Sequence, residues 1–256
     1  MKFNIFIKVF LIFVLTLPIF SFANNQTKSA FEKANSLYSK GNYKAALAVY
    51  KQINEDGYES ASLFFNMGNA FYKLGDIASS ILYYEKAHKL APNDDDINFN
   101  IKFANQKISD KIEETPEFFL TTWLKWVYLG FSINTLSLLN VLLIFLASVV
   151  LIVYLYANNV KLKKTTFFVS IGLFIIGFVF IIISTKQTDD LESHKQAIIF
   201  SNAVSVKNAP NESSATLLIL HDGTKVNIID NQNGWIKIVL ANGNQGWLKA
   251  NDIKEI

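Results

Sequence analysis

The sequence predicts a multidomain membrane protein with three parts: an α-helical solenoid, a two-helix transmembrane hairpin and a C-terminal all-β barrel. Three observations support this fold class. Residues 27–94 contain an internal repeat at the spacing of paired-helix repeats. Residues 136–156 and 165–185 are uncharged apolar segments long enough to cross a bilayer. Residues 201–256 alternate apolar and polar positions between turn signals, which is typical of short strands.

The composition excludes several classes of chemistry. The chain contains no cysteine, so it forms no disulfide, thiolate nucleophile or cysteine-bound cluster. The net charge is only +3, and the lysines are spread along a chain that has no arginine. We therefore expect no nucleic-acid partner, because such proteins usually carry a concentrated basic patch.

The first segment, residues 1–23, is predicted to be a secretory signal peptide. Lys2 and Lys8 accompany an apolar run, and the small residues at Ser21 and Ala23 favour cleavage after Ala23. The alternative is an uncleaved anchor helix. Both interpretations place the following residues outside the cytoplasm.

Residues 24–110 are predicted to form the helical repeat domain, with repeats at about 27–60 and 61–94 and a capping helix at 95–110. The second repeat resembles the tetratricopeptide (TPR) pattern through Gly68, Phe71, Gly75, Ile81, Tyr84, Ala87 and Pro92. The first repeat departs from the pattern: Lys33 replaces an apolar packing residue, and Tyr58 stands where proline is common.

The TPR resemblance implies that the first helix of each repeat lines a concave groove that binds a peptide or a partner helix. The positions that correspond to this groove are aromatic residues and amides: Phe31, Asn35, Tyr38, Phe65, Asn69, Tyr72, Phe99 and Phe103. Aromatic rings would bury apolar anchors and the asparagines would bind a peptide backbone. The alternative is that these residues pack against one another.

Six aromatic residues lie within residues 111–135, before the first apolar segment: Phe118, Phe119, Trp123, Trp126, Tyr128 and Phe131. Tryptophan and tyrosine favour the membrane interface, so we expect an interfacial helix here. The alternative is a third membrane span, although Lys125 lies near its middle.

The hairpin itself has spans at 136–156 and 165–185 and a loop at 157–164. The loop carries Lys161, Lys163 and Lys164 and no acid, which favours a cytoplasmic loop. We therefore expect a multi-pass protein of the bacterial inner (cytoplasmic) membrane, with its N- and C-terminal domains in the periplasm.

After a linker at 186–200, residues 201–256 are predicted to form five short strands. Pro210, Gly234-Trp235, Asn242-Gly243 and Gly246-Trp247 occur in the order found in bacterial SH3-like (SH3b) domains, which this segment resembles. The resemblance implies that Pro210, Trp235 and Trp247 contact a peptide or peptidoglycan. The alternative is that both tryptophans are core residues.

No residues form a recognisable catalytic constellation. His88, His194 and His221 lie in separate regions without metal-ligand spacing, and His88 and His221 are expected to be solvated. We expect no enzymatic activity, no metal and no cofactor.

The order of the segments resembles the BatE-type component of the bacterial aerotolerance (Bat) operon. That resemblance implies a non-enzymatic, membrane-anchored adaptor in an envelope-stress complex, with Bat-type membrane proteins that carry von Willebrand A domains as partners. Two other interpretations are an accessory protein of a cell-wall enzyme and a transmembrane sensor.

Overall fold

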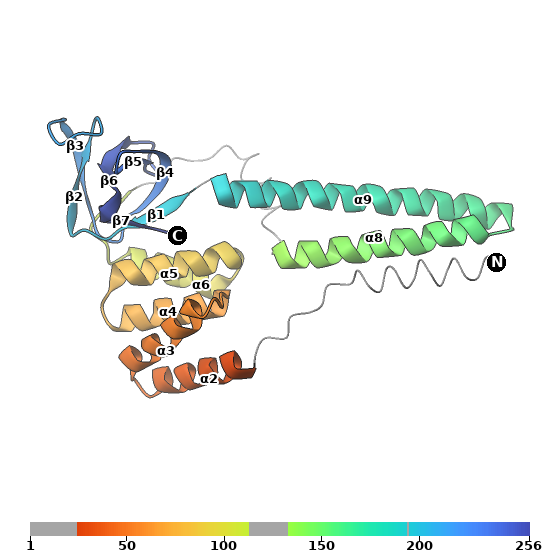
Figure 1. The fold of residues 1–256 in the computed structure, drawn as a ribbon, viewed down its shortest axis with the longest axis horizontal. Helices are drawn as coiled ribbons and strands as arrows, with labels where there is room; N and C mark the ends of the chain where they lie inside the picture. Colours follow the sequence, from red (N-terminus) through yellow and green to blue (C-terminus); the bar gives the residue numbers. More distant parts are fainter. Residues whose placement is uncertain (1–24, 113–132, 194) are drawn as a thin grey trace.

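The computed structural model describes residues 25–112, 133–193 and 195–256 (Figure 1). Within these ranges the chain forms five short helices, a pair of long apolar helices and a seven-stranded sheet. The predicted signal peptide and most of the predicted interfacial helix lie outside the described residues.

The five short helices follow the predicted repeat boundaries. They are α2 (Asn25–Ser39), α3 (Tyr43–Glu55), α4 (Ala61–Lys73), α5 (Ile77–Leu90) and α6 (Asp95–Asn105). Side-chain caps fix where three of them begin. Ser60 accepts a hydrogen bond from the backbone N–H of Leu63 at 3.1 Å, Asp76 does so from Ser79 at 3.0 Å, and Asp94 caps α6.

Small residues let the paired helices α4 and α5 approach closely. A Cβ atom placed on Gly68 would lie 2.5 Å from Cδ1 of Tyr84, so a larger side chain would push the helices apart. Leu63, Met67 and Ala70 on α4 are fully buried. Gly68, one of the residues that carry the TPR resemblance, is thus a packing position between α4 and α5.

The long helices are α8 (Ile133–Tyr156) and α9 (Val160–Ser193), which run antiparallel and extend away from the rest of the molecule (Figure 1). Two segments, Thr135–Tyr156 and Val160–Lys186, are long and apolar enough to cross a membrane. α9 is longer than predicted at both ends. Asn159 accepts a hydrogen bond from the backbone N–H of Lys161 at 2.9 Å, so most of the predicted loop belongs to the first turns of α9.

The C-terminal part is one antiparallel sheet in the order β3-β2-β6-β5-β4-β1-β7. The strands are β1 (Gln196–Ile199), β2 (Ala203–Lys207), β3 (Thr216–His221), β4 (Lys225–Gln232), β5 (Trp235–Val239), β6 (Gln245–Lys249) and β7 (Ile253–Glu255). Among the described residues the sheet is not closed, because β3 and β7 are its edges.

Two strands exceed the five that were predicted, β1 and β7. β1 lies in the segment predicted to be a linker, although its residues Ala197, Ile198 and Ile199 are fully buried. Alternation of apolar and polar residues is the sequence signal of a strand with one solvent-exposed face. A four-residue strand covered on both faces has no alternation, so β1 lacks that signal.

Candidate protein-binding site

The repeat domain contains an internal hydrogen-bond network that begins at Asn35 on α2. Oδ1 of Asn35 accepts hydrogen bonds from Oη of Tyr50 at 2.6 Å and from Nδ2 of Asn66 at 3.0 Å. Burial raises the pKa of Tyr50 to about 12, which keeps its hydroxyl protonated as a donor. The network links α2, α3 and α4.

The same network recurs one repeat later. Oδ1 of Asn69 accepts hydrogen bonds from Oη of Tyr84 at 2.7 Å and from Nδ2 of Asn100 at 3.0 Å. The pKa of Tyr84 is also raised to about 12 by burial. Asn35 and Asn69 were predicted to bind a partner's backbone. Their oxygens are instead occupied within the stack, which leaves their Nδ2 groups without a hydrogen bond inside the described part of the chain.

Two of the three recurring phenylalanines are part of the packing. Phe31 lies 5.9 Å from the ring of Tyr50, and Phe65 lies 5.8 Å from the ring of Tyr84. Both pack partly buried against the hydrophobic core. For these two residues the structure matches the alternative in which the aromatic residues pack against one another.

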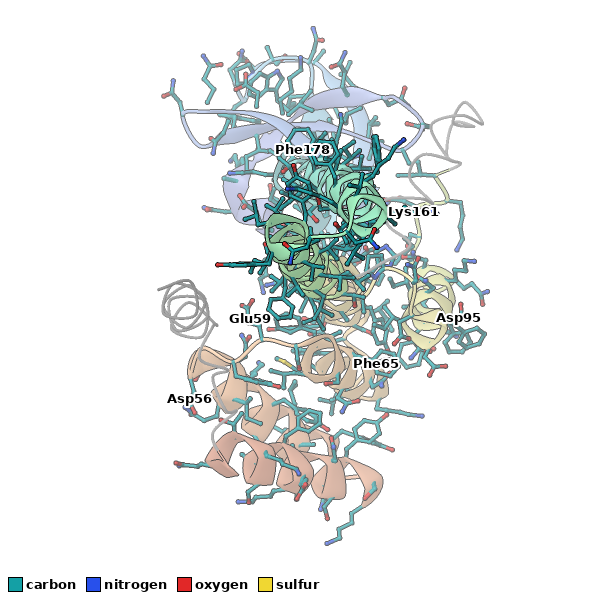
Figure 2. The ribbon with its side chains drawn as sticks, turned by 90° about the vertical axis from the view of Figure 1, so that its right-hand side faces the viewer. Asp56, Glu59, Phe65, Asp95, Lys161 and Phe178 are labelled. Atoms are coloured by element: carbon teal, nitrogen blue, oxygen red, sulfur yellow. The ribbon has the colours of Figure 1, made fainter. Side chains whose placement is uncertain are left out.

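The exposed aromatic surface lies at the C-terminal end of the predicted groove. Phe99 and Phe103 on α6 stack with their ring centroids 6.1 Å apart, and Tyr72 on α4 lies 5.4 Å from Phe103. Phe99 is 65% exposed and Phe103 is 42% exposed. We call Tyr72, Phe99 and Phe103 the aromatic shelf. The labels of Phe65 and Asp95 locate its helices, α4 and α6, in Figure 2. Tyr38, on the first repeat, stacks edge-on against Tyr43 instead.

The sheet covers the end of the repeat stack next to α6. Ile198 of β1 is fully buried in one cluster with Ile81, Leu82 and Ala104 from α5 and α6. A Cβ atom on Gly223 would lie 2.5 Å from Cγ2 of Ile108, so the turn before β4 also sits directly on the repeat domain. The two domains therefore share a hydrophobic core.

Polar contacts fix one side of this interface. The carboxylate of Asp110 accepts hydrogen bonds from the backbone N–H of His221 at 2.7 Å and from the hydroxyl of Thr224 at 2.7 Å, and it lies 2.8 Å from Nδ1 of His221. Burial alone would raise the pKa of Asp110. The hydrogen bonds from His221 and Thr224 outweigh burial and hold that pKa below its usual value.

A second polar contact lies on α5. Nζ of Lys225 is 2.7 Å from Oε2 of Glu85, whose side chain is only 6% exposed. The buried carboxylate of Glu85 needs the ammonium group of Lys225, because desolvation of a charge without a partner is costly. Lys89 of α5 also donates a hydrogen bond to the carbonyl oxygen of Ile256.

The prediction that His88 and His221 are solvated is wrong for His88, which is half-buried with Nδ1 lacking a hydrogen-bond partner. The side chain of His221 is 39% exposed, but it also bonds to Asp110. Burial lowers the pKa of His88, with Lys225 contributing in the same direction. Sequence reasoning missed the interface because its residues lie on opposite sides of the hairpin in the chain, far apart in sequence.

The residues of the sheet that were predicted to contact a ligand lie on other elements than the aromatic shelf. Trp235 and Trp247 occupy β5 and β6, where the register pairs Trp235 with Lys249 and Trp247 with Lys237. Both rings are partly exposed, and neither belongs to the buried core of the sheet. Pro210 lies in the loop between β2 and β3 and is also partly exposed. Within the described ranges, no group of three or more histidine or acidic residues is placed to hold a metal ion.

The comparisons with known proteins identify one repeat. The tetratricopeptide repeat family matches residues 61–94, which are α4, α5 and the turn that follows. No curated protein matches the chain. One solved structure with a similar region is an NlpC/P60 family protein from Bacillus cereus ATCC 10987, at 17% identity and a TM-score of 0.22; the match covers 28% of this chain and 23% of that chain. This chain thus spans less than a quarter of that protein's length.

Proposed function

We propose that the protein is a non-enzymatic, membrane-anchored adaptor that binds a partner protein at the aromatic shelf of its repeat domain. The observation that carries the proposal is the exposed stack of Phe99 and Phe103, with the partly buried Tyr72 tilted against Phe103, beside a TPR repeat. Clustered exposed aromatic rings are typical of sites that anchor apolar side chains of a partner. TPR repeats usually bind proteins, which favours a polypeptide ligand.

The contacts between the repeat domain and the sheet support a common location for both. Asp110 precedes the hairpin and His221 follows it, yet they are hydrogen-bonded. Only an even number of membrane crossings between them keeps both residues on one side. Lys161, Lys163 and Lys164 at the tip of the hairpin favour a cytoplasmic tip, and therefore a periplasmic location for both domains.

The resemblance to BatE-type proteins suggests the partners. We propose Bat-type membrane proteins with von Willebrand A domains, in a complex that serves aerotolerance or envelope stress. The adaptor role is supported by the aromatic character of the shelf, whose ring faces suit the burial of a partner's apolar side chains.

The test is site-specific photo-crosslinking in native membranes. A photoreactive phenylalanine at Phe99 should capture a membrane protein that carries a von Willebrand A domain. The matched position is Lys51, exposed on α3, which should capture none. Capture of the same proteins from both positions, or of none from Phe99, would refute the proposal.

A matched pair of alanine variants separates binding from folding. Phe99→Ala should weaken partner binding by roughly 5- to 150-fold, the range for an aromatic anchor, without lowering the melting temperature. Phe65→Ala should lower the melting temperature, because its ring packs against Tyr84. If Phe99→Ala also lowers the melting temperature to that extent, the aromatic shelf is structural.

A second binding surface is favoured by the outward tryptophans of the sheet. We propose that residues 201–256 are an SH3-like module and that Trp235 and Trp247, together with Pro210 of the loop between β2 and β3, contact peptidoglycan. Co-sedimentation of the full-length protein with isolated peptidoglycan should fall for Trp247→Ala and stay unchanged for Asn242→Ala, an exposed turn residue. Equal retention by both variants would exclude this role.

A further inference from the structure

Four hydroxyl side chains of the apolar hairpin bond to their own helix. Hydroxyl groups donate to a backbone carbonyl one turn earlier at 2.8–3.0 Å: Ser148 to Ile144, Thr166 to Leu162, Ser170 to Phe167 and Thr185 to Ile181. Such bonds satisfy a hydroxyl inside a bilayer without a second helix.

Asn140 on α8 is different. Its Oδ1 atom is buried and has no hydrogen-bond partner among the described residues. The side chain lies against Gly177 of α9, where a Cβ atom would be 3.4 Å from Oδ1. The residue as a whole remains partly exposed. The hairpin therefore holds a buried amide oxygen without a partner, on a side chain that is partly open to the outside.

An open apolar groove begins one turn from this amide. Ile144, which also lies against Gly177, lines the groove together with Phe174, Ile175, Phe178 and Ile181 of α9. Its volume is about 410 Å³. Figure 2 looks toward the hairpin and labels Phe178. A third helix beside the hairpin could bury apolar side chains in this groove and meet the amide at the same time.

We propose that Asn140 joins the hairpin to the hairpin of a second copy of this chain. An asparagine amide is self-complementary, since one copy can donate from Nδ2 while the other accepts at Oδ1 after a rotation of the amide. Two copies inserted in the same orientation are related by a two-fold axis along the membrane normal, which places Asn140 of both at equal depth. An apolar helix without an amide at that depth would fill the groove but leave Asn140 unsatisfied.

The proposal rests on the membrane crossing proposed above, but not on the ligand of the aromatic shelf. Because the chain has no cysteine, single cysteines report contacts without background. Ser137 lies on the same strip of α8 as Asn140 and Ile144, three residues before the amide, whereas Leu138 points to another face at nearly the same depth. Both side chains are exposed.

The experiment is oxidative crosslinking of the full-length protein in native membranes. Ser137→Cys should form disulfide-linked dimers roughly tenfold faster than Leu138→Cys, if interhelical asparagine bonds hold the pair. Adding Asn140→Leu to Ser137→Cys should remove that difference, and adding Asn140→Gln should retain it. Ser148→Ala, which loses only a bond within its own helix, should leave crosslinking unchanged.

Three outcomes would overturn the dimer. They are equal crosslinking from both cysteines, crosslinking that Asn140→Leu does not reduce, and exclusive crosslinking to a different membrane protein. Extraction with alkaline carbonate distinguishes failure of the dimer alone from failure of membrane anchoring. If the wild-type protein is extracted, the membrane anchoring of the proposed function fails along with the dimer. If it stays in the membrane, only the dimer is refuted.

Discussion

The two ends of the repeat stack differ in how they avoid exposing an apolar outer face to water. Residue 33 of the first repeat corresponds to residue 67 of the second repeat and to residue 101 of the capping helix α6. Lys33 is exposed, Met67 is fully buried and Ile101 packs against two hydrophobic clusters. An end repeat has no neighbour to cover its outer face. At the N-terminal end, Lys33 replaces the apolar packing residue, so that this face can be exposed to solvent.

The C-terminal end stays apolar and is covered by the sheet instead. A further TPR helix would pack against α5 and α6, and that place is taken by β1 with Ile198 fully buried. The difference shows that the sheet acts as the cap of the stack, in addition to any ligand of its own. It follows that the two ends should respond very differently to substitution.

The largest effect is expected at Ile198. Ile198→Ala should cost about 2–5 kcal/mol, because it opens a cavity between the domains. Ile199→Ala is the matched control: it is equally buried but faces the core of the sheet. Hydrogen exchange should rise in α5 and α6 for Ile198→Ala and mainly in the sheet for Ile199→Ala. Identical exchange patterns would mean that the sheet does not cap the stack.

A smaller effect is expected at the ion pair of the covered end. Lys225→Met leaves the Glu85 carboxylate buried without its cation, so we expect a loss of about 1–3 kcal/mol in denaturant unfolding. Lys249→Met breaks an exposed pair with Glu212 and should change stability by less than about 1 kcal/mol. Equal losses of unfolding free energy for the two variants would show that the Glu85 carboxylate is hydrated in solution.

Asp110 gives the covered end a pH dependence. Its pKa is depressed in the folded protein, so the stability it adds is present above the unfolded value of about 3.9 and is lost as the pH falls through the lower folded value. Asp110→Asn should cost about 1–2 kcal/mol at neutral pH and should reduce the loss of stability below about pH 4. Melting curves between pH 3 and pH 7 measure both effects. An unchanged acid limb in the variant would assign that limb to other carboxylates.

The smallest effect is expected at the N-terminal end. Lys33→Ala should change the free energy of unfolding by less than about 0.5 kcal/mol, because the side chain is exposed. Met67→Ala, at the same position of the next repeat, should cost about 2–5 kcal/mol. A large loss for Lys33→Ala would mean that this end is covered after all.

Sequence patterns predicted the parts of the molecule that depend on local periodicity. The second repeat was recognisable because Gly68, Ala87 and Pro92 each answer a local requirement of paired helices. The two apolar helices were recognisable from length and composition. Their ends were not, since the cap at Asn159 and the polar last turns of α9 continue the helix beyond the apolar stretch.

The candidate site was predicted only in part, because burial on a helix face depends on what lies opposite. Phe65 and Phe99 occupy equivalent positions and look alike in sequence. Phe65 packs against Tyr84, whereas within residues 25–112 no further helix follows α6 to supply a ring opposite Phe99, which is 65% exposed. The contact between Asp110 and His221 could not be predicted, since it joins two domains across the hairpin.

The capping of the stack by β1 has a consequence for how the protein is made. In a chain synthesised from its N-terminus, α5 and α6 leave the ribosome long before β1 does. Their apolar face thus stays uncovered until α8, α9 and then β1 have been synthesised. A chain that stalls or is cut after α9 keeps this face open to chaperones and proteases. Docking of β1 therefore distinguishes molecules synthesised beyond α9 from unfinished ones.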